Sequence, residues 1–293
     1  MKVFVTGGTG LIGRALVKRL LADGHQITVL TRQSLDSSKN LTYINAIDDL
    51  NARQDIVINL AGAGLADRRW SSAYKIEIRA SRIDLTKALV SRLRFIGMPD
   101  LFVSGSAIGI YGESKVREFS ETDGVGSGFS AELCRDWEAS AGDPWDEDTR
   151  YVLLRTGVVL DDSHGAYPQM TQSFRFGLAS WMGQGDHWLS WIHLTDMVGA
   201  IMHCIESQAV SGPVNMTAPH PVTHRSFADV VSNVKTTVMN MGIPGCIMRL
   251  VVGKMADELL LTGQRVIPNK LLSSGYEFQF DTLKDAVADL EKR

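Results

Sequence analysis

The stretch MKVFVTGGTGLIG, residues 1–13, runs from a short β-rich, mostly apolar segment directly into a glycine-rich turn, and apolar residues then recur at helical spacing up to Gly24. Glycine adopts backbone angles closed to other residues and lets a ligand approach the main chain, and the N-terminus of the following helix favours a pyrophosphate. An ordinary glycine-rich turn is the alternative. The strand before it and the helix after it favour a dinucleotide site, with these residues lining it: Thr6, Gly7, Gly10, Leu11, Ile12 and Gly13.

Composition excludes several classes of protein. The chain has 293 residues, a formal net charge of −3 and 44% hydrophobic residues, with Lys and Arg scattered along it. We therefore expect a chain with ample core and no nucleic-acid surface. Its three cysteines show no disulfide or metal-ligand spacing. With no leader and no apolar run of membrane-spanning length, we expect a cytoplasmic protein without a metal or membrane partner.

Strand and helix patterns alternate through the first half of the chain. Strands are expected at 2–6, 26–31, 41–44, 55–60, 101–104 and 151–155, and helices at 71–93 and 132–141. Ser71 is the expected N-cap of the long helix, with Ile76, Ala80 and Ile83 as its buried stripe. This pattern predicts an α/β fold, a Rossmann-type doubly wound parallel sheet. We expect this domain at 1–160, with a returning segment near 188–206, and a smaller α+β substrate region and C-terminal domain at 161–293.

The end of the second expected strand bears on the choice of cofactor. An acidic residue there binds the ribose 2′-hydroxyl of NAD, whereas arginine accommodates the 2′-phosphate of NADP. The strand ends Leu30-Thr31-Arg32, with no acidic residue before Asp36, so NADP(H) is favoured. A solvated loop cation is the alternative for Arg32. Carboxyl ends of parallel strands bind ligands, so the next strand is expected to place these residues beside the cofactor: Leu60, Ala61 and Gly62.

With these residues in place, the chain resembles the extended short-chain dehydrogenase/reductase superfamily, of the NAD(P)-dependent epimerase/dehydratase type. The resemblance rests on the segments 6–13, 58–62, 104–107 with Tyr111-Gly112, and 191–196. More narrowly, Trp137-Glu138, the segment 155–160 and the tail 263–268 are similar to a sugar-nucleotide epimerase-like branch. That branch ends in a short C-terminal domain of unassigned role.

The resemblance implies further cofactor contacts. Thr31 and Arg32 would hold the 2′-phosphate end, Glu77 and Arg82 would approach the cofactor, and backbone around Val159 would border the nicotinamide. A homodimer formed by two exposed helices is the partner that the superfamily implies.

The catalytic residues that the resemblance implies are incomplete. Ser106 fits the family's serine, but Ser130 and Cys134 stand where the general-acid tyrosine and its lysine belong. A buried Cys134 is more often an apolar filler than a nucleophile. Tyr111 is a candidate acid, with a structural role as the alternative. Packing and hydrogen bonding are the expected roles of His193 and Asp196.

An aromatic cluster follows where the substrate region should begin. It either stacks on a ligand or fills a small core, and its members are Phe174, Phe176, Trp181, His187, Trp188 and Trp191. The sequence therefore predicts an NADP(H)-binding oxidoreductase or epimerase for a small carbonyl, alcohol or nucleotide-sugar substrate. The alternative is a non-catalytic NADP(H)-binding sensor or structural protein, because the Tyr-x-x-x-Lys pair is missing.

Overall fold

A seven-stranded parallel sheet forms the centre of the protein. The structure is a computed structural model that describes residues 1–141, 148–253 and 255–292. The strand order is β12-β7-β5-β4-β1-β2-β3, and their bounds are β1 Lys2–Thr6, β2 Gln26–Leu30, β3 Leu41–Ile44, β4 Ile56–Asn59, β5 Leu101–Ala107, β7 Arg150–Thr156 and β12 Gly212–Met216. The expected Rossmann-type sheet is confirmed.

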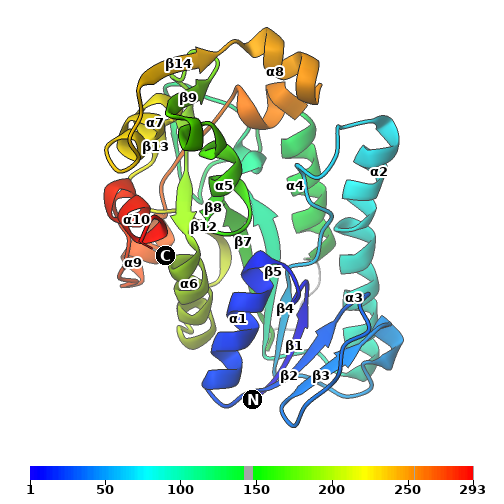
Figure 1. Ribbon diagram of the computed structural model, residues 1–293. Helices are drawn as coiled ribbons and strands as arrows, with labels where there is room; N and C mark the ends of the chain where they lie inside the picture. The colour runs from blue at the N-terminus through cyan, green and yellow to red at the C-terminus, as the bar shows by residue number, and fades with distance from the viewer. Residues whose placement is uncertain (142–147, 254, 293) are drawn as a thin grey trace.

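Helices cover both faces of this sheet (Figure 1). On one face α1 (Leu11–Ala22) packs beside α6 (Leu194–Glu206), and on the other α3 (Ile83–Ile96) packs beside α4 (Phe129–Ala141), which starts three residues before the expected Glu132. Apolar strand residues alternate between the two resulting cores: Val3 and Val5 face the first, Phe4 the second. Burial on both faces explains why these strands are almost continuously apolar in sequence.

The long helix expected at 71–93 is two helices, α2 (Ser72–Ala80) and α3. Ser71 is its N-cap, as predicted, and accepts a hydrogen bond from the Tyr74 amide at 3.1 Å. The expected stripe is wrong at Ile76, which is 68% exposed. Tyr74 and Ile78 form the buried face of α2, and a residue two positions from each of them lies on the opposite side of the helix. Ile78 is fully buried instead.

A second layer stands on the carboxyl side of the sheet. Its short strands pair as β8 with β11, β9 with β14, β10 with β13 and β6 with β15. A separate core holds two of the expected aromatic residues, Phe174 and Trp191, whereas Phe176 is 83% exposed. The remaining bounds are β6 Glu118–Phe119, β8 Val158–Leu160, α5 Ala166–Met170, β9 Leu178–Met182, β10 Trp188–Leu189, β11 Trp191–His193, β13 Val222–Thr223, α7 His224–Ser232, β14 Met239–Ile243, α8 Gly245–Val252, β15 Arg265–Val266, α9 Asn269–Ser273 and α10 Leu283–Leu290.

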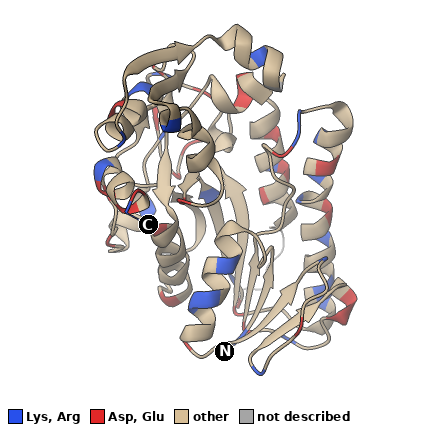
Figure 2. Cartoon of the chain, in the orientation of Figure 1, with Lys and Arg blue, Asp and Glu red and all other residues tan. Residues whose placement is uncertain are grey.

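The two halves of the chain are interleaved. Helix α6 lies within the expected returning segment, but β12 follows it and adds an edge strand beside β7. Basic and acidic side chains are interspersed along the visible helices (Figure 2). Within the described residues, no helix is long and apolar enough to cross a membrane.

Candidate functional site

A cavity of about 540 Å³ lies at the carboxyl ends of the central strands. Its lining combines the glycine-rich turn with the ends of β4, β5 and β7 and with segments of the second layer. The predicted residues that line it are Gly7, Gly10, Leu11, Ile12, Gly13, Leu60, Gly62, Arg82, Ser106 and Val159. In open α/β sheets this edge is where ligands bind.

The glycine-rich turn is built by close backbone approach. Gly7 has φ +71° and its carbonyl accepts a hydrogen bond from the Gly10 amide at 3.0 Å. A Cβ at Gly13 would lie 2.1 Å from the Gly7 oxygen, so only glycine fits. Gly10 caps α1 without a side-chain hydrogen bond, and the first turn holds no acidic residue. The amides and positive dipole end of α1 are therefore oriented to receive an anion.

The end of β4 is held beside this turn by a buried polar network. Thr6 Oγ1 donates to Asn59 Oδ1 at 2.6 Å and accepts from the Ala61 amide at 3.2 Å. Asn59 in turn donates to Thr86 at 2.8 Å. Thr6 and Ala61 thus position the backbone of Leu60 and Gly62 and do not themselves line the cavity.

Arg82 is a buried cation at the cavity. It is 9% exposed, lies over the Trp137 ring at 5.2 Å and makes no ion pair with a carboxylate among the described residues. Burial lowers the pKa of its guanidinium. A Cβ at Gly62 would come within 2.9 Å of the Arg82 guanidinium carbon, so the two are in close contact. A buried guanidinium without a carboxylate is suited to bind an anionic ligand.

The remaining predicted cofactor residues lie outside this lining. Thr31 is buried and accepts from the Gln33 amide at 3.1 Å, while Arg32 is exposed and makes no ion pair within the described residues. Both follow β2, whose Leu30 pairs with Thr6 beside the glycine turn. Glu77 forms an ion pair with Arg68 at 3.2 Å on an exposed part of α2.

Ser106 belongs to a buried chain of hydrogen bonds. Its hydroxyl donates to Glu138 at 2.6 Å, and Glu138 accepts twice from Arg155, at 2.9 and 3.0 Å. Arg155 donates to the Tyr111 hydroxyl at 3.0 Å, which donates to Asn215 at 2.6 Å. Burial disfavours the Arg155 charge, but hydrogen bonds to Glu138 and Tyr111 outweigh it and raise its pKa. Tyr111 is 3% exposed and does not line the cavity, which favours its structural role.

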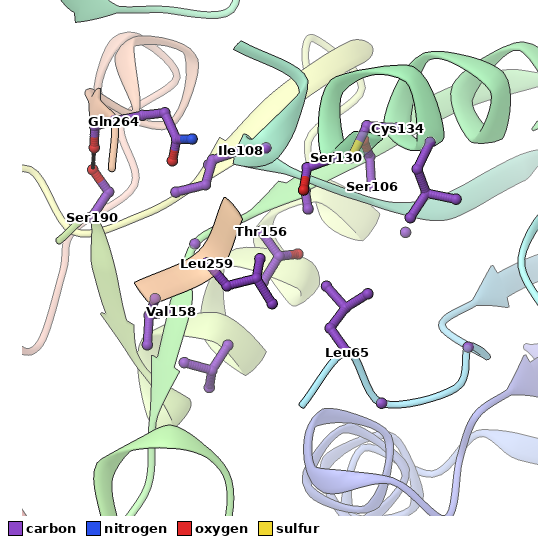
Figure 3. Close-up of a pocket in the computed structure, with 18 of the residues that line it drawn as sticks. Leu65, Ser106, Ile108, Ser130, Cys134, Thr156, Val158, Ser190, Leu259 and Gln264 are labelled. Carbon is purple, nitrogen blue, oxygen red and sulfur yellow. Dashed lines mark hydrogen bonds between the residues drawn. The ribbon is translucent and has the colours of Figure 1, made fainter. Parts of the chain in front are cut away.

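Ser130 and Cys134 line the cavity together with Ser106 (Figure 3). Burial, followed by the charge of Glu138, raises the pKa of the Cys134 thiol to about 12. The thiolate that nucleophilic chemistry requires is therefore scarce near neutral pH. This supports the expectation that Cys134 is an apolar filler.

Residues 258–264 supply part of the cavity lining, which the sequence did not predict. Glu258 lines the cavity and accepts from the Phe129 and Ser130 amides at 3.2 Å and from Ser130 Oγ at 3.0 Å. A carboxylate at this point caps α4 and complements its dipole. Arg69 donates to the carbonyl of Val251, at the end of α8, at 2.6 Å. An adjoining cavity of about 440 Å³ shares Ser130 and Glu258.

His193 and Asp196 have the expected structural roles. His193 Nδ1 accepts from the Thr195 amide at 3.1 Å and caps α6. The Asp196 carboxylate accepts from the Gln279 and Phe280 amides, both at 2.8 Å, and from Tyr276. Asp196 thereby holds residues 276–280 against α6.

Comparisons with known proteins agree with this architecture. The profile of the NAD dependent epimerase/dehydratase family matches residues 3–217, and a domain of unknown function matches residues 243–290. An epimerase family protein of Mycobacterium bovis is 36% identical over 97% of this chain and 96% of its own. A chloroplastic SDR39U1 homolog of Arabidopsis thaliana is 34% identical over 98% of this chain and 86% of its own.

Solved structures extend the likeness to the whole chain. Human epimerase family protein SDR39U1, crystallised with NADPH, is 32% identical with a TM-score of 0.91, and both chains are covered completely. A nucleoside-diphosphate sugar epimerase from Corynebacterium glutamicum is 28% identical with a TM-score of 0.77, over 98% of this chain and 57% of its own. The fold, the glycine-rich turn and these matches show that this chain belongs to the NAD dependent epimerase/dehydratase family.

Proposed function

We propose that this protein binds NADP(H) in the cavity at the glycine-rich turn. The observation that carries the proposal is the close contact between Gly13 and Gly7. Because no side chain fills this turn, the amides at the N-terminus of α1 are accessible to a pyrophosphate. The buried Arg82 adds positive charge on the same lining. Arg32 at the end of β2 would hold the 2′-phosphate. The similar human SDR39U1, solved with NADPH, supports the same cofactor here.

We further propose that the protein is an oxidoreductase for a small carbonyl or alcohol. When bound, the nicotinamide supplies or accepts a hydride. Ser106 lines the cavity and gives its own proton to the hydrogen bond with Glu138, so its oxygen is free to accept from a substrate hydroxyl. In reduction the carbonyl oxygen takes a proton from water as the carbon takes the hydride, and the hydroxyl so formed donates to Ser106; oxidation of an alcohol runs through the same contacts in reverse. The ion pair with Arg155 fixes Glu138, and through it the Ser106 rotamer.

A non-catalytic NADP(H)-binding protein is the second candidate. The resemblance implies that Ser130 and Cys134 stand where the family holds its acid–base pair, and burial raises the pKa of the Cys134 thiol to about 12. Neither side chain supplies a lysine-activated phenol, which supports a sensing or structural use of the nucleotide.

Turnover distinguishes the two candidates. Consumption of NADPH is followed by absorbance with a panel of ketones, aldehydes, quinones and sugar nucleotides, for the wild type and for Ser106→Ala. An oxidoreductase shows turnover that falls about 10- to 100-fold in Ser106→Ala while the NADPH Kd stays unchanged. Tight NADPH binding without turnover across the panel supports the second candidate.

A further inference from the structure

Two histidine rings lie against each other at one wall of the cavity. His224, the first residue of α7, lines the cavity and is 7% exposed. Its ring lies against that of His187, with centroids 4.1 Å apart. The His224 amide donates to the His187 carbonyl at 3.1 Å, and within the part of the chain that the structure describes no side-chain hydrogen bond of the His224 ring is found. Polar groups in protein interiors are nearly always paired, so an imidazole that lines the cavity without a protein partner is available to hydrogen-bond a ligand there.

This imidazole is neutral. Burial, together with the neighbouring His187, lowers the pKa of His224 to about 3. Burial also lowers the pKa of His187, although Asp186 opposes that change. A neutral imidazole offers one N–H donor and one acceptor nitrogen. A neutral imidazole therefore hydrogen-bonds a hydroxyl or carbonyl oxygen, but it carries no positive charge that would attract an anion.

The surroundings of His224 indicate the rest of the ligand. Leu259 and Val158 line the same space as Ser106 and Ser130 (Figure 3), and Trp188 adds an aromatic wall. Apolar walls with a few polar groups are typical of small-molecule sites.

The two charged lining residues have different packing partners. Arg82 packs against Gly62, close to the glycine-rich turn, whereas the Glu258 carboxylate is bonded to the start of α4. A phosphate-bearing substrate that contacts Ser130 would lie beside the Glu258 carboxylate, which repels it and opposes the attraction of Arg82.

We propose that His224 is a substrate-binding residue that holds the oxygen of a small, uncharged carbonyl or hydroxyl compound with an apolar body. This inference rests on the proposed function, because it assigns the glycine-turn end of the cavity to NADP(H). The inference narrows the substrate to small uncharged compounds and disfavours nucleotide sugars.

The test is a binding and turnover measurement on the full chain. The protein is saturated with NADPH, and menadione, an uncharged planar quinone, is compared with UDP-glucose as the charged probe. His224→Phe keeps a ring but removes both nitrogens. His187→Phe is the matched control, because the His187 ring lies against the His224 ring without lining the cavity. His224→Asn restores a short hydrogen-bonding group.

We expect saturable menadione binding that weakens about tenfold in His224→Phe, the size of one lost hydrogen bond. His187→Phe should change the menadione affinity less than about threefold. His224→Asn should recover part of the affinity that His224→Phe loses. The NADPH affinity should be unchanged in all three variants. The inference is overturned if His224→Phe and wild type bind menadione equally, or if UDP-glucose binds more tightly than menadione. If His224→Phe fails to bind NADPH, His224→Asn alone decides between these outcomes. Failure of the wild type to bind NADPH would overturn the proposed function itself.

Discussion

At the scale of single residues, Gly13 and Ser106 illustrate two different constraints. A Cβ at Gly13 would meet backbone atoms of Gly7 at 2.1 Å and of Gly8 at 2.7 Å, which side-chain movement cannot relieve. The constraint on Ser106 comes instead from side chains, because Glu138 and Arg155 hold its hydroxyl. The first constraint is local in sequence, whereas the second joins three separate elements.

Gly13→Ala should weaken NADPH binding by at least about tenfold and destabilise the protein by about 1–3 kcal/mol, because the added methyl pushes the turn away from the start of α1. Fluorescence titration and urea denaturation measure the two effects. Gly124→Ala is the control, since a Cβ there meets nothing within 4 Å. Unchanged NADPH affinity in Gly13→Ala would contradict the assigned role of the turn.

Glu138→Gln should destabilise the protein by about 3–5 kcal/mol, because it leaves the 8%-exposed Arg155 side chain without its counter-charge. Adding Arg155→Met should recover part of this loss. Asp23→Asn breaks the more exposed pair with Arg19 and should cost less than about 1 kcal/mol. Equal losses for the buried and exposed pairs in thermal denaturation would show that the network is not structural.

At the scale of elements, the segment of residues 245–253 and 255–260 is tied to the rest of the protein at two points, and Glu258 and Leu259 line the cavity. Arg69 holds the end of α8, and Glu258 holds the start of α4. These partners are 182 and 128 residues apart in sequence, so no local pattern predicts them. For the same reason the sequence did not predict the break between α2 and α3, where Arg82 is buried against Trp137.

Breaking both ties with Arg69→Ala and Glu258→Gln should increase the NADPH dissociation rate about tenfold or more, because each change removes charge-assisted hydrogen bonds that hold the segment over the cavity. Stopped-flow displacement of NADPH measures this rate. Arg249→Ala is the matched control, because its ion pair with Asp257 lies within the segment. A rate as slow as that of the wild type would mean that the segment does not retain the nucleotide.

At the scale of the whole molecule, the parallel sheet was predictable and the composite site was only partly so. The central strands other than β12 are mostly apolar segments, and the glycine-rich turn is made of neighbouring residues, so both could be predicted from the sequence. His224 and Glu258 enter the cavity through tertiary packing, and β12 follows a long excursion into the second layer. The sequence contained only a weak signal for His224, a histidine directly after the helix-capping Thr223.

The stability of the whole chain should fall as pH drops below about 6.5, because the unfolded chain binds a proton that folded His224, with its pKa of about 3, excludes. His187 acts in the same direction. Urea unfolding at about pH 7 and about pH 5 measures the change. His224→Phe should reduce the loss between these values, and an equal loss in that variant would assign the acid sensitivity elsewhere.

The most direct test of the central claim is a fluorescence titration of NADPH and NADH against the wild type and Arg32→Asp. We predict that the wild type binds NADPH at least about tenfold more tightly than NADH, because Arg32 pairs with the 2′-phosphate. Charge reversal should abolish that preference. Equal affinity for the two nucleotides, or a preference that survives in Arg32→Asp, would contradict the assignment of this site to NADP(H).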